Sequence, residues 1–170
     1  MSFGLLILRL VAGGTMFGHG AQKLFGWFGG GGLQGTAGFF GNMGFRPALP
    51  AALAAGLAEA GGLLLAAGLL TPLAALGIAT VMATAIALVH WSKGFWNTKG
   101  GYEFPLLLFA TAVALTATGP GRFSIDRAIG WDDNITGVWW AVGVAAAAVA
   151  LTFVTITLGR RRERLETSAA

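Results

Sequence analysis

The chain has 170 residues, a mean hydropathy of +0.72, 55% hydrophobic residues and 11% charged residues. Soluble domains carry about 25% charged residues, so this composition excludes an ordinary soluble protein and indicates a membrane-embedded one. There is no cysteine, which excludes thiol catalysis, disulfides and thiolate metal sites within the chain. The net charge is +4, but four of the eleven basic residues lie in the run RRRER at 160–164. That placement favours orientation at a membrane over nucleic-acid binding.

Residues 3–28 begin with an apolar run that predicts a membrane-spanning helix, broken only by Arg9 and small residues. An arginine in hydrocarbon costs about 2.5–3.5 kcal/mol on insertion scales. Arg9 is therefore expected to face protein and to have a partner. Gly14 and Gly18 form a GxxxG pair, which predicts close approach of another helix at that face.

Residues 24–46 are rich in glycine and aromatic side chains. Residues 30–35 match GxGxxG by letters, but no strand precedes them, so the match does not indicate a dinucleotide site. Positions 33, 37, 40 and 44 recur at helical spacing. This pattern predicts a flexible turn followed by a short interfacial helix.

Two further spans are predicted at residues 49–70 and 73–91. Glu59 is the only charged residue of the second span and lies near its middle. The short Thr71-Pro72 segment predicts a tight turn, so the two spans form an antiparallel hairpin. His90 stands at the far end of the third span.

A fourth span is predicted over residues 104–118, which is short for about 30 Å of hydrocarbon. A polar loop follows, and a fifth apolar run at 136–158 is interpreted as an added membrane anchor. The sequence thus predicts a four-helix membrane domain at 1–135 and an additional transmembrane helix with a basic tail at 136–170.

The distribution of basic residues predicts the orientation. With five spans and a cytoplasmic tail, eight basic residues fall on the cytoplasmic side and two on the other. Positive charge concentrates on the cytoplasmic side of membrane proteins. We therefore expect a bacterial inner-membrane protein with its N-terminus outside and its C-terminus in the cytoplasm.

This topology predicts an intramembrane ion pair between Arg9 and Glu59. Glu59 lies near mid-membrane, and the long side chain of Arg9 can reach toward it from the first span. The pair has two interpretations: a structural contact that fixes helix register, or a proton- or ligand-linked site, because intramembrane charges are functional candidates.

A second group of polar residues is predicted to meet at the cytoplasmic ends of the first, third and fourth spans. We call this group the polar mouth; its members are His19, Gln22, Lys23, His90, Tyr102 and Glu103. Lys23 is expected to neutralise Glu103. The group is either a ligand site or a set of anchors at headgroup level. No HxxxH or ExxH pair occurs on one helix, so no metal site is predicted.

Four motifs, in order, resemble the DoxX family: LRLVAGGTMFGHGAQKLFGWFGGGG, the Glu59 span ending in GGLLLAAGLLTP, HWSKGFWNTKGGYEFPLLL and TGPGRFSID. The resemblance covers roughly residues 4–126. It implies a small four-helix bacterial or archaeal membrane protein associated with respiratory or redox-stress assemblies; the family name derives from the DoxD subunit of a thiosulfate:quinone oxidoreductase. It also implies that seven residues match the family's polar pattern: Arg9, His19, Gln22, Lys23, Glu59, His90 and Glu103.

The expected fold is an all-α integral membrane four-helix bundle with a short interfacial helix and an additional C-terminal transmembrane helix. The leading hypothesis is a membrane subunit of an oxidoreductase assembly that binds a quinone at the polar mouth. Its expected partners are the lipid bilayer and oxidoreductase subunits, with no nucleic acid. The alternatives are a small transporter using the Arg9–Glu59 layer, and a scaffold without a ligand. The chain has no flavin, nicotinamide or haem-attachment motif, so it lacks an obvious redox centre of its own, and electrons would have to come from a partner or pass directly to a bound quinone.

Overall fold

The computed structural model of the chain describes residues 2–168, with side chains described for residues 2–159. The predicted basic run at 160–164 therefore lies outside the described side chains. Within the described residues every regular element is a helix and there is no strand. The α-helices are α1 (Ser2–Phe25), α2 (Gly32–Asn42), α3 (Ala48–Ala60), α4 (Gly62–Ala67), α5 (Thr71–Ala85), α6 (Glu103–Thr118), α7 (Ile125–Ala128) and α8 (Val138–Ser168). A π-helical turn (Ile86–His90) continues α5.

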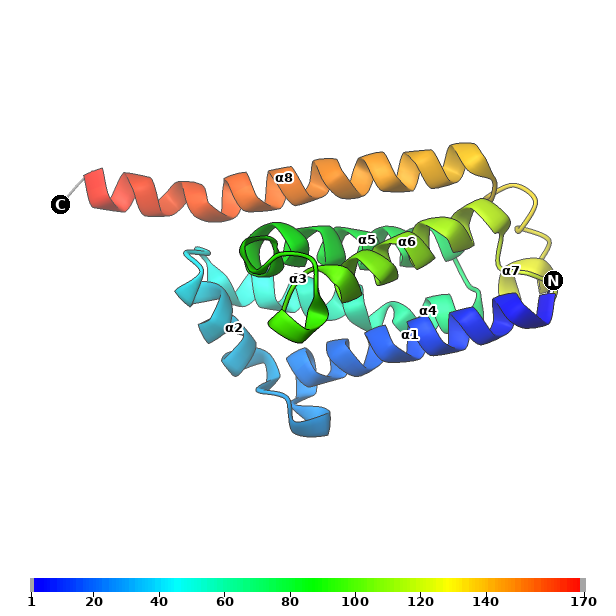
Figure 1. Cartoon of the computed structure of the whole chain (residues 1–170), viewed down its shortest axis with the longest axis horizontal. Coiled ribbons are helices and arrows are strands. Elements are labelled where there is room, and N and C mark those ends of the chain that lie inside the picture. Colours follow the sequence, from blue (N-terminus) through cyan, green and yellow to red (C-terminus); the bar gives the residue numbers. More distant parts are fainter. Residues whose placement is uncertain (1, 169–170) are drawn as a thin grey trace.

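Four segments are long and apolar enough to cross a membrane: Ser2–Phe25, Ala48–Ala67, Thr71–Lys93 and Val138–Gly159. α6 has 16 residues, or about 24 Å of helix, and is shorter than these. The long helices lie side by side, and the start of α1 and the end of α8 lie at opposite ends of the bundle (Figure 1). These findings confirm the all-helical membrane fold, and the chain is a multi-pass membrane protein.

α2 crosses one end of the bundle at a steep angle to the long helices (Figure 1). This end is called the α2 end below, and the opposite end is called the α7 end. The sequence spacing thus correctly predicted a short helix here. The Thr36 hydroxyl ties α2 to α1 because it lies 3.3 Å from the carbonyl oxygen of Lys23.

Glycines set the antiparallel register of α1 against α3 and α4. A Cβ at Gly13 would collide with the carbonyl oxygen of Gly62, and a Cβ at Gly20 would collide with the backbone of Ala60. Gly14 and Gly18 have nothing within 4 Å of an added Cβ. The prediction of a close helix approach was therefore right, but the predicted helix face was wrong: Gly13 and Gly20 lie at the contact, and the GxxxG pair does not.

At the α7 end the connection between α4 and α5 is held by a buried carboxylate. Asp126 is fully buried and accepts hydrogen bonds from the backbone N–H groups of Leu70 (2.8 Å) and Thr71 (3.0 Å) and from the Thr71 hydroxyl (2.7 Å). The first N–H groups of a helix have no partner within it, so Asp126 caps α5 from a distant part of the chain. The sequence had predicted a tight turn at Thr71-Pro72. In the structure the turn between α4 and α5 ends at Leu70, and Thr71 and Pro72 already belong to the first turn of α5.

α8 packs against α5 and α6 and not along α3 within the described part of the chain. The Thr152 hydroxyl lies 3.2 Å from the carbonyl oxygen of Thr80 and 3.2 Å from the Thr84 hydroxyl. Near its far end, α8 meets the segment between α2 and α3. There the backbone N–H of Arg46 donates to the carbonyl oxygen of Gly159 at 3.0 Å.

Candidate ligand-binding pocket

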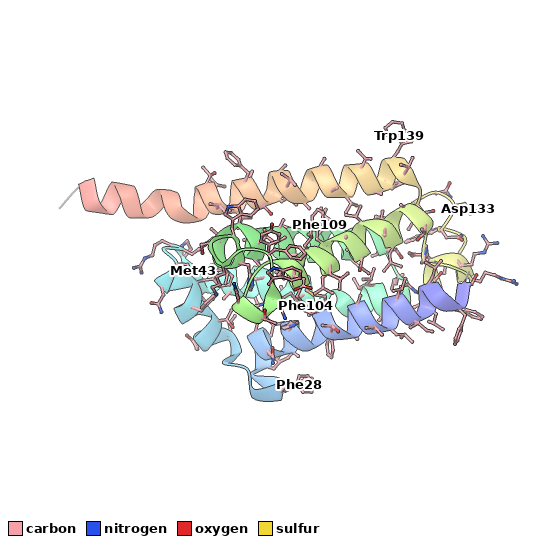
Figure 2. The ribbon with its side chains drawn as sticks, viewed as in Figure 1. Phe28, Met43, Phe104, Phe109, Asp133 and Trp139 are labelled. Carbon is pink, nitrogen blue, oxygen red and sulfur yellow. The ribbon has the colours of Figure 1, made fainter. Side chains whose placement is uncertain are left out.

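A cavity of about 560 Å³ lies between α3 and α5 and is the candidate functional site. Ligand pockets in proteins measure about 300–1,000 Å³. Along α5 and its π-helical turn the lining runs from Leu73 to Val89, which is about 24 Å of helix. α2 contributes Phe39, Phe40 and Met43 at one end, and the side chain of Met43 is labelled there in Figure 2. The lining is almost entirely apolar, as suits a hydrocarbon ligand.

Among residues 2–159, whose side chains the structure describes, Lys23 and Glu59 supply the only charged side chains in this lining. Both carboxylate oxygens of Glu59 accept hydrogen bonds from the Lys23 ammonium group. The Glu59 side chain is only 2% exposed, whereas that of Lys23 is 29% exposed. The described lining therefore contains one internally compensated pair of charges, three threonines (Thr80, Thr84 and Thr155) and otherwise apolar side chains.

The Lys23–Glu59 pair corrects the predicted Arg9–Glu59 contact. Arg9 and Lys23 are fourteen residues apart on α1, or about 21 Å along the helix. The glycine register that brings residue 20 to residue 60 also brings Arg9 to Gly68, where an added Cβ would meet the guanidinium group. Arg9 is fully buried there and donates through Nη2 to the carbonyl oxygen of Phe123.

The structure gives the residues of the predicted polar mouth separate hydrogen-bond partners. His19 is exposed, and Gln22 donates to the carbonyl oxygen of Phe28 at 3.2 Å. Nδ1 of His90 lies 2.7 Å from the carbonyl oxygen of Gly100. Within residues 2–159 no hydrogen bond or ion pair joins the mouth residues of α1 to His90, Tyr102 or Glu103.

Tyr102 and Glu103 organise the loop that precedes α6. Tyr102 stacks on Trp91 with ring centroids 5.4 Å apart and an angle of 16° between the planes. A Glu103 carboxylate oxygen accepts a hydrogen bond from the backbone N–H of Asn97 at 2.9 Å. Glu103 is thus held within its own loop. The sequence had predicted that Lys23 neutralises Glu103, and this prediction was wrong, because Lys23 pairs with Glu59. Of the six mouth residues, only Lys23 lines the pocket.

Two features of the structure were not recognised in the sequence. The aromatic residues of α2 were interpreted only as interfacial, although they form one end of the pocket. Asp126 was counted as a residue of a polar loop, although it is fully buried. Ser124 accepts a hydrogen bond from the backbone N–H of Arg127 at 3.2 Å and so caps the short helix that contains Asp126, but this local cap does not indicate that Asp126 is buried. Among the described residues, no group of three or more His, Asp or Glu is placed to hold a metal ion.

Comparison with known proteins supplies the family. The DoxX family model matches residues 4–91, just over half of the chain, and this range contains Arg9, Lys23 and Glu59. The resemblance drawn from the sequence extended further, to residue 126, and so included the segment that carries Asp126. No curated protein and no solved structure matches the chain. The matched range covers α1 to the end of the π-helical turn, and the chain therefore belongs to the DoxX family.

Proposed function

We propose that this protein is a membrane subunit of an oxidoreductase assembly and that it binds a quinone in the pocket between α3 and α5. The observation that carries the proposal is the combination of a long apolar cavity with one compensated ion pair in its lining. The first part of the proposal, membership of an oxidoreductase assembly, rests on the sequence resemblance, which implies that DoxX proteins are associated with respiratory and redox-stress assemblies.

The ion pair favours an uncharged head group. Lys23 and Glu59 neutralise each other, so a phosphate or an ammonium head group would find no free counter-charge among the lining side chains of residues 2–159. A quinone carbonyl can accept a hydrogen bond from the ammonium group, which has three donors. A quinol hydroxyl can donate to the carboxylate. The pair thus offers a partner for each state of a neutral redox lipid.

The aromatic end of the pocket suits a flat ring. Phe40 and Phe45 pack edge to face with centroids 5.3 Å apart, and both line the pocket together with Phe39 and Met43. Aromatic rings favour offset or edge-to-face contact with other rings. The remaining apolar lining continues along α5 and can accept an isoprenoid tail.

The transporter alternative rested on an Arg9–Glu59 layer, and the structure places those two residues with other partners. That alternative loses the contact on which it was based. We also propose that the protein lies in the bacterial inner membrane with its N-terminus outside and its C-terminus in the cytoplasm. The start of α1 and the end of α8 lie at opposite ends of the bundle, which supports termini on opposite sides of the membrane (Figure 1).

Quinone content after gentle solubilisation tests the proposal. Wild-type protein should retain quinone at up to one molecule per chain, measured by lipid extraction and mass spectrometry. Ala55→Phe fills the pocket without adding charge and should reduce the retained quinone about tenfold, which corresponds to 1.4 kcal/mol of lost affinity. Ala114→Phe, on the exposed face of α6, is the matched control and should retain the wild-type amount. Absence of quinone from the wild type, or equal retention by both variants, would contradict the proposal.

A further inference from the structure

We infer that α8 is a wall of the ligand site and that, with Phe45, it seals the pocket from water at the α2 end, so that ligands enter sideways from the bilayer. This inference rests on the quinone site proposed above and restricts its ligands to molecules dissolved in the membrane. The sequence had suggested only an added anchor for this helix. α8 also lies outside the residues matched by the family model.

α8 takes part in the pocket directly. Leu151 and Thr155 line it, one and three residues from Thr152. Thr152 holds α8 against α5 through its contacts with Thr80 and Thr84. Hydrogen bonds between helices hold neighbouring membrane spans together. The Thr152 contacts therefore fix the helix face that Leu151 and Thr155 present to the cavity.

The seal at the α2 end is a contact between Phe45 and Gly159. Phe45 is 1% exposed, and a Cβ added at Gly159 would lie about 2.5 Å from its ring. The hydrogen bond from the Arg46 backbone to Gly159 fixes the two segments together. The glycine thus allows α8 to lie directly on the ring that ends the pocket, which leaves no room for water to pass between them.

The side of the pocket between α3 and α8 is open. These two helices do not pack along each other in the described part of the chain. Leu57, Leu73 and Leu151 belong to the lining and are 57%, 60% and 43% exposed. Because α3, α5 and α8 are membrane-spanning segments, the medium at this side is lipid. An apolar tail can leave the pocket here without crossing a polar surface.

Spin labels test the inference without any added ligand, and the chain has no native cysteine to interfere. A nitroxide attached to the cysteine of Thr155→Cys lies in the pocket wall, and one attached to the cysteine of Asn42→Cys lies on the exposed end of α2. Collision with dissolved oxygen reports contact with lipid, and collision with a polar nickel chelate reports contact with water. In protein reconstituted in vesicles open to both reagents, the label at 155 should meet the chelate about tenfold less often than the label at 42, because polar solutes are excluded from apolar surroundings.

Breaking the seal should reverse that result. Gly159→Leu, and separately Phe45→Ala, should bring nickel accessibility at position 155 to within about twofold of that at position 42, because water then reaches the cavity. Gly143→Leu is the matched control, since an added Cβ there meets nothing within 4 Å. Equal chelate access at 155 and 42 in the otherwise unaltered protein would overturn the inference, whatever the variants do. An absence of bound quinone would refute the proposed ligand and leave these accessibilities unchanged, so the two failures are distinguishable.

Discussion

Asp126→Ala is expected to lower the free energy of unfolding by about 3–5 kcal/mol, because it leaves buried donors unpaired at the start of α5. The backbone N–H groups of Leu70 and Thr71 and the Thr71 hydroxyl all lose their acceptor. The carboxylate also acts electrostatically on Arg9, which is fully buried. Thermal unfolding in detergent should show a midpoint lower by roughly 10 °C, from the usual scaling for a chain of this length.

Asp133→Ala provides the control for this prediction. The Asp133 side chain is 87% exposed and forms an ion pair with Arg127 at 3.5 Å. Surface ion pairs of this kind contribute about 0–1 kcal/mol, so the midpoint should hardly move. The unfolding midpoint of Asp126→Asn should lie between those of Asp126→Ala and Asp133→Ala, because the amide oxygen still accepts hydrogen bonds. Equal midpoints for Asp126→Ala and Asp133→Ala would mean that Asp126 does not hold the α7 end together.

Lys23→Met should be more damaging than Glu59→Gln, although both break the same ion pair. Lys23→Met strands a carboxylate that is 2% exposed, and removing one partner of a buried pair costs about 3–5 kcal/mol. Glu59→Gln leaves the ammonium group of Lys23 unpaired, but the Lys23 side chain is 29% exposed and can turn toward water, so the cost should be smaller. Unfolding of both variants in detergent measures the difference.

A double-mutant cycle isolates the contact itself. The combined Lys23→Met and Glu59→Gln protein should be more stable than the sum of the single changes indicates, by up to about 3 kcal/mol. Arg9→Met combined with Glu59→Gln should be additive, since these residues have different partners. Coupling of Glu59 to Arg9 instead of Lys23 would restore the pairing that the sequence suggested and refute the one in the structure.

The helices could be predicted from the sequence because apolar runs and helical spacing are local properties. The spans and the interfacial helix at Leu33–Gly44 were found in this way, and the structure has them at nearly the same residues. The register of α1 against α3 and α4 is not a local property of either segment. Gly13 and Gly14 are neighbours in the chain, yet only Gly13 meets another backbone closely. The approaches of Gly13 to Gly62 and of Gly20 to Ala60 belong to the register that places Glu59 beside Lys23, and no local pattern reveals that register.

The pocket was beyond sequence reasoning for a similar reason. Its volume is the space that remains between α3, α5 and α8, so it depends on helix separations that no single segment determines. Phe40 and Phe45 gave a signal as aromatic residues of an interfacial segment, but their direction toward the cavity depends on where α8 lies. Asp126 looked solvated because its partners, Leu70 and Thr71, are more than fifty residues away in the chain.

In the proposed quinone site, the ligand head group binds between α2 and the Lys23–Glu59 pair. Photo-crosslinking with an azido-quinone, followed by peptide mapping, tests it most directly. The structure predicts labelled peptides that contain Phe39–Phe45, Glu59 or Thr155, and loss of the label in Ala55→Phe. Labelling confined to His19 and the loop at 91–103 would place the ligand at the polar mouth and contradict the pocket.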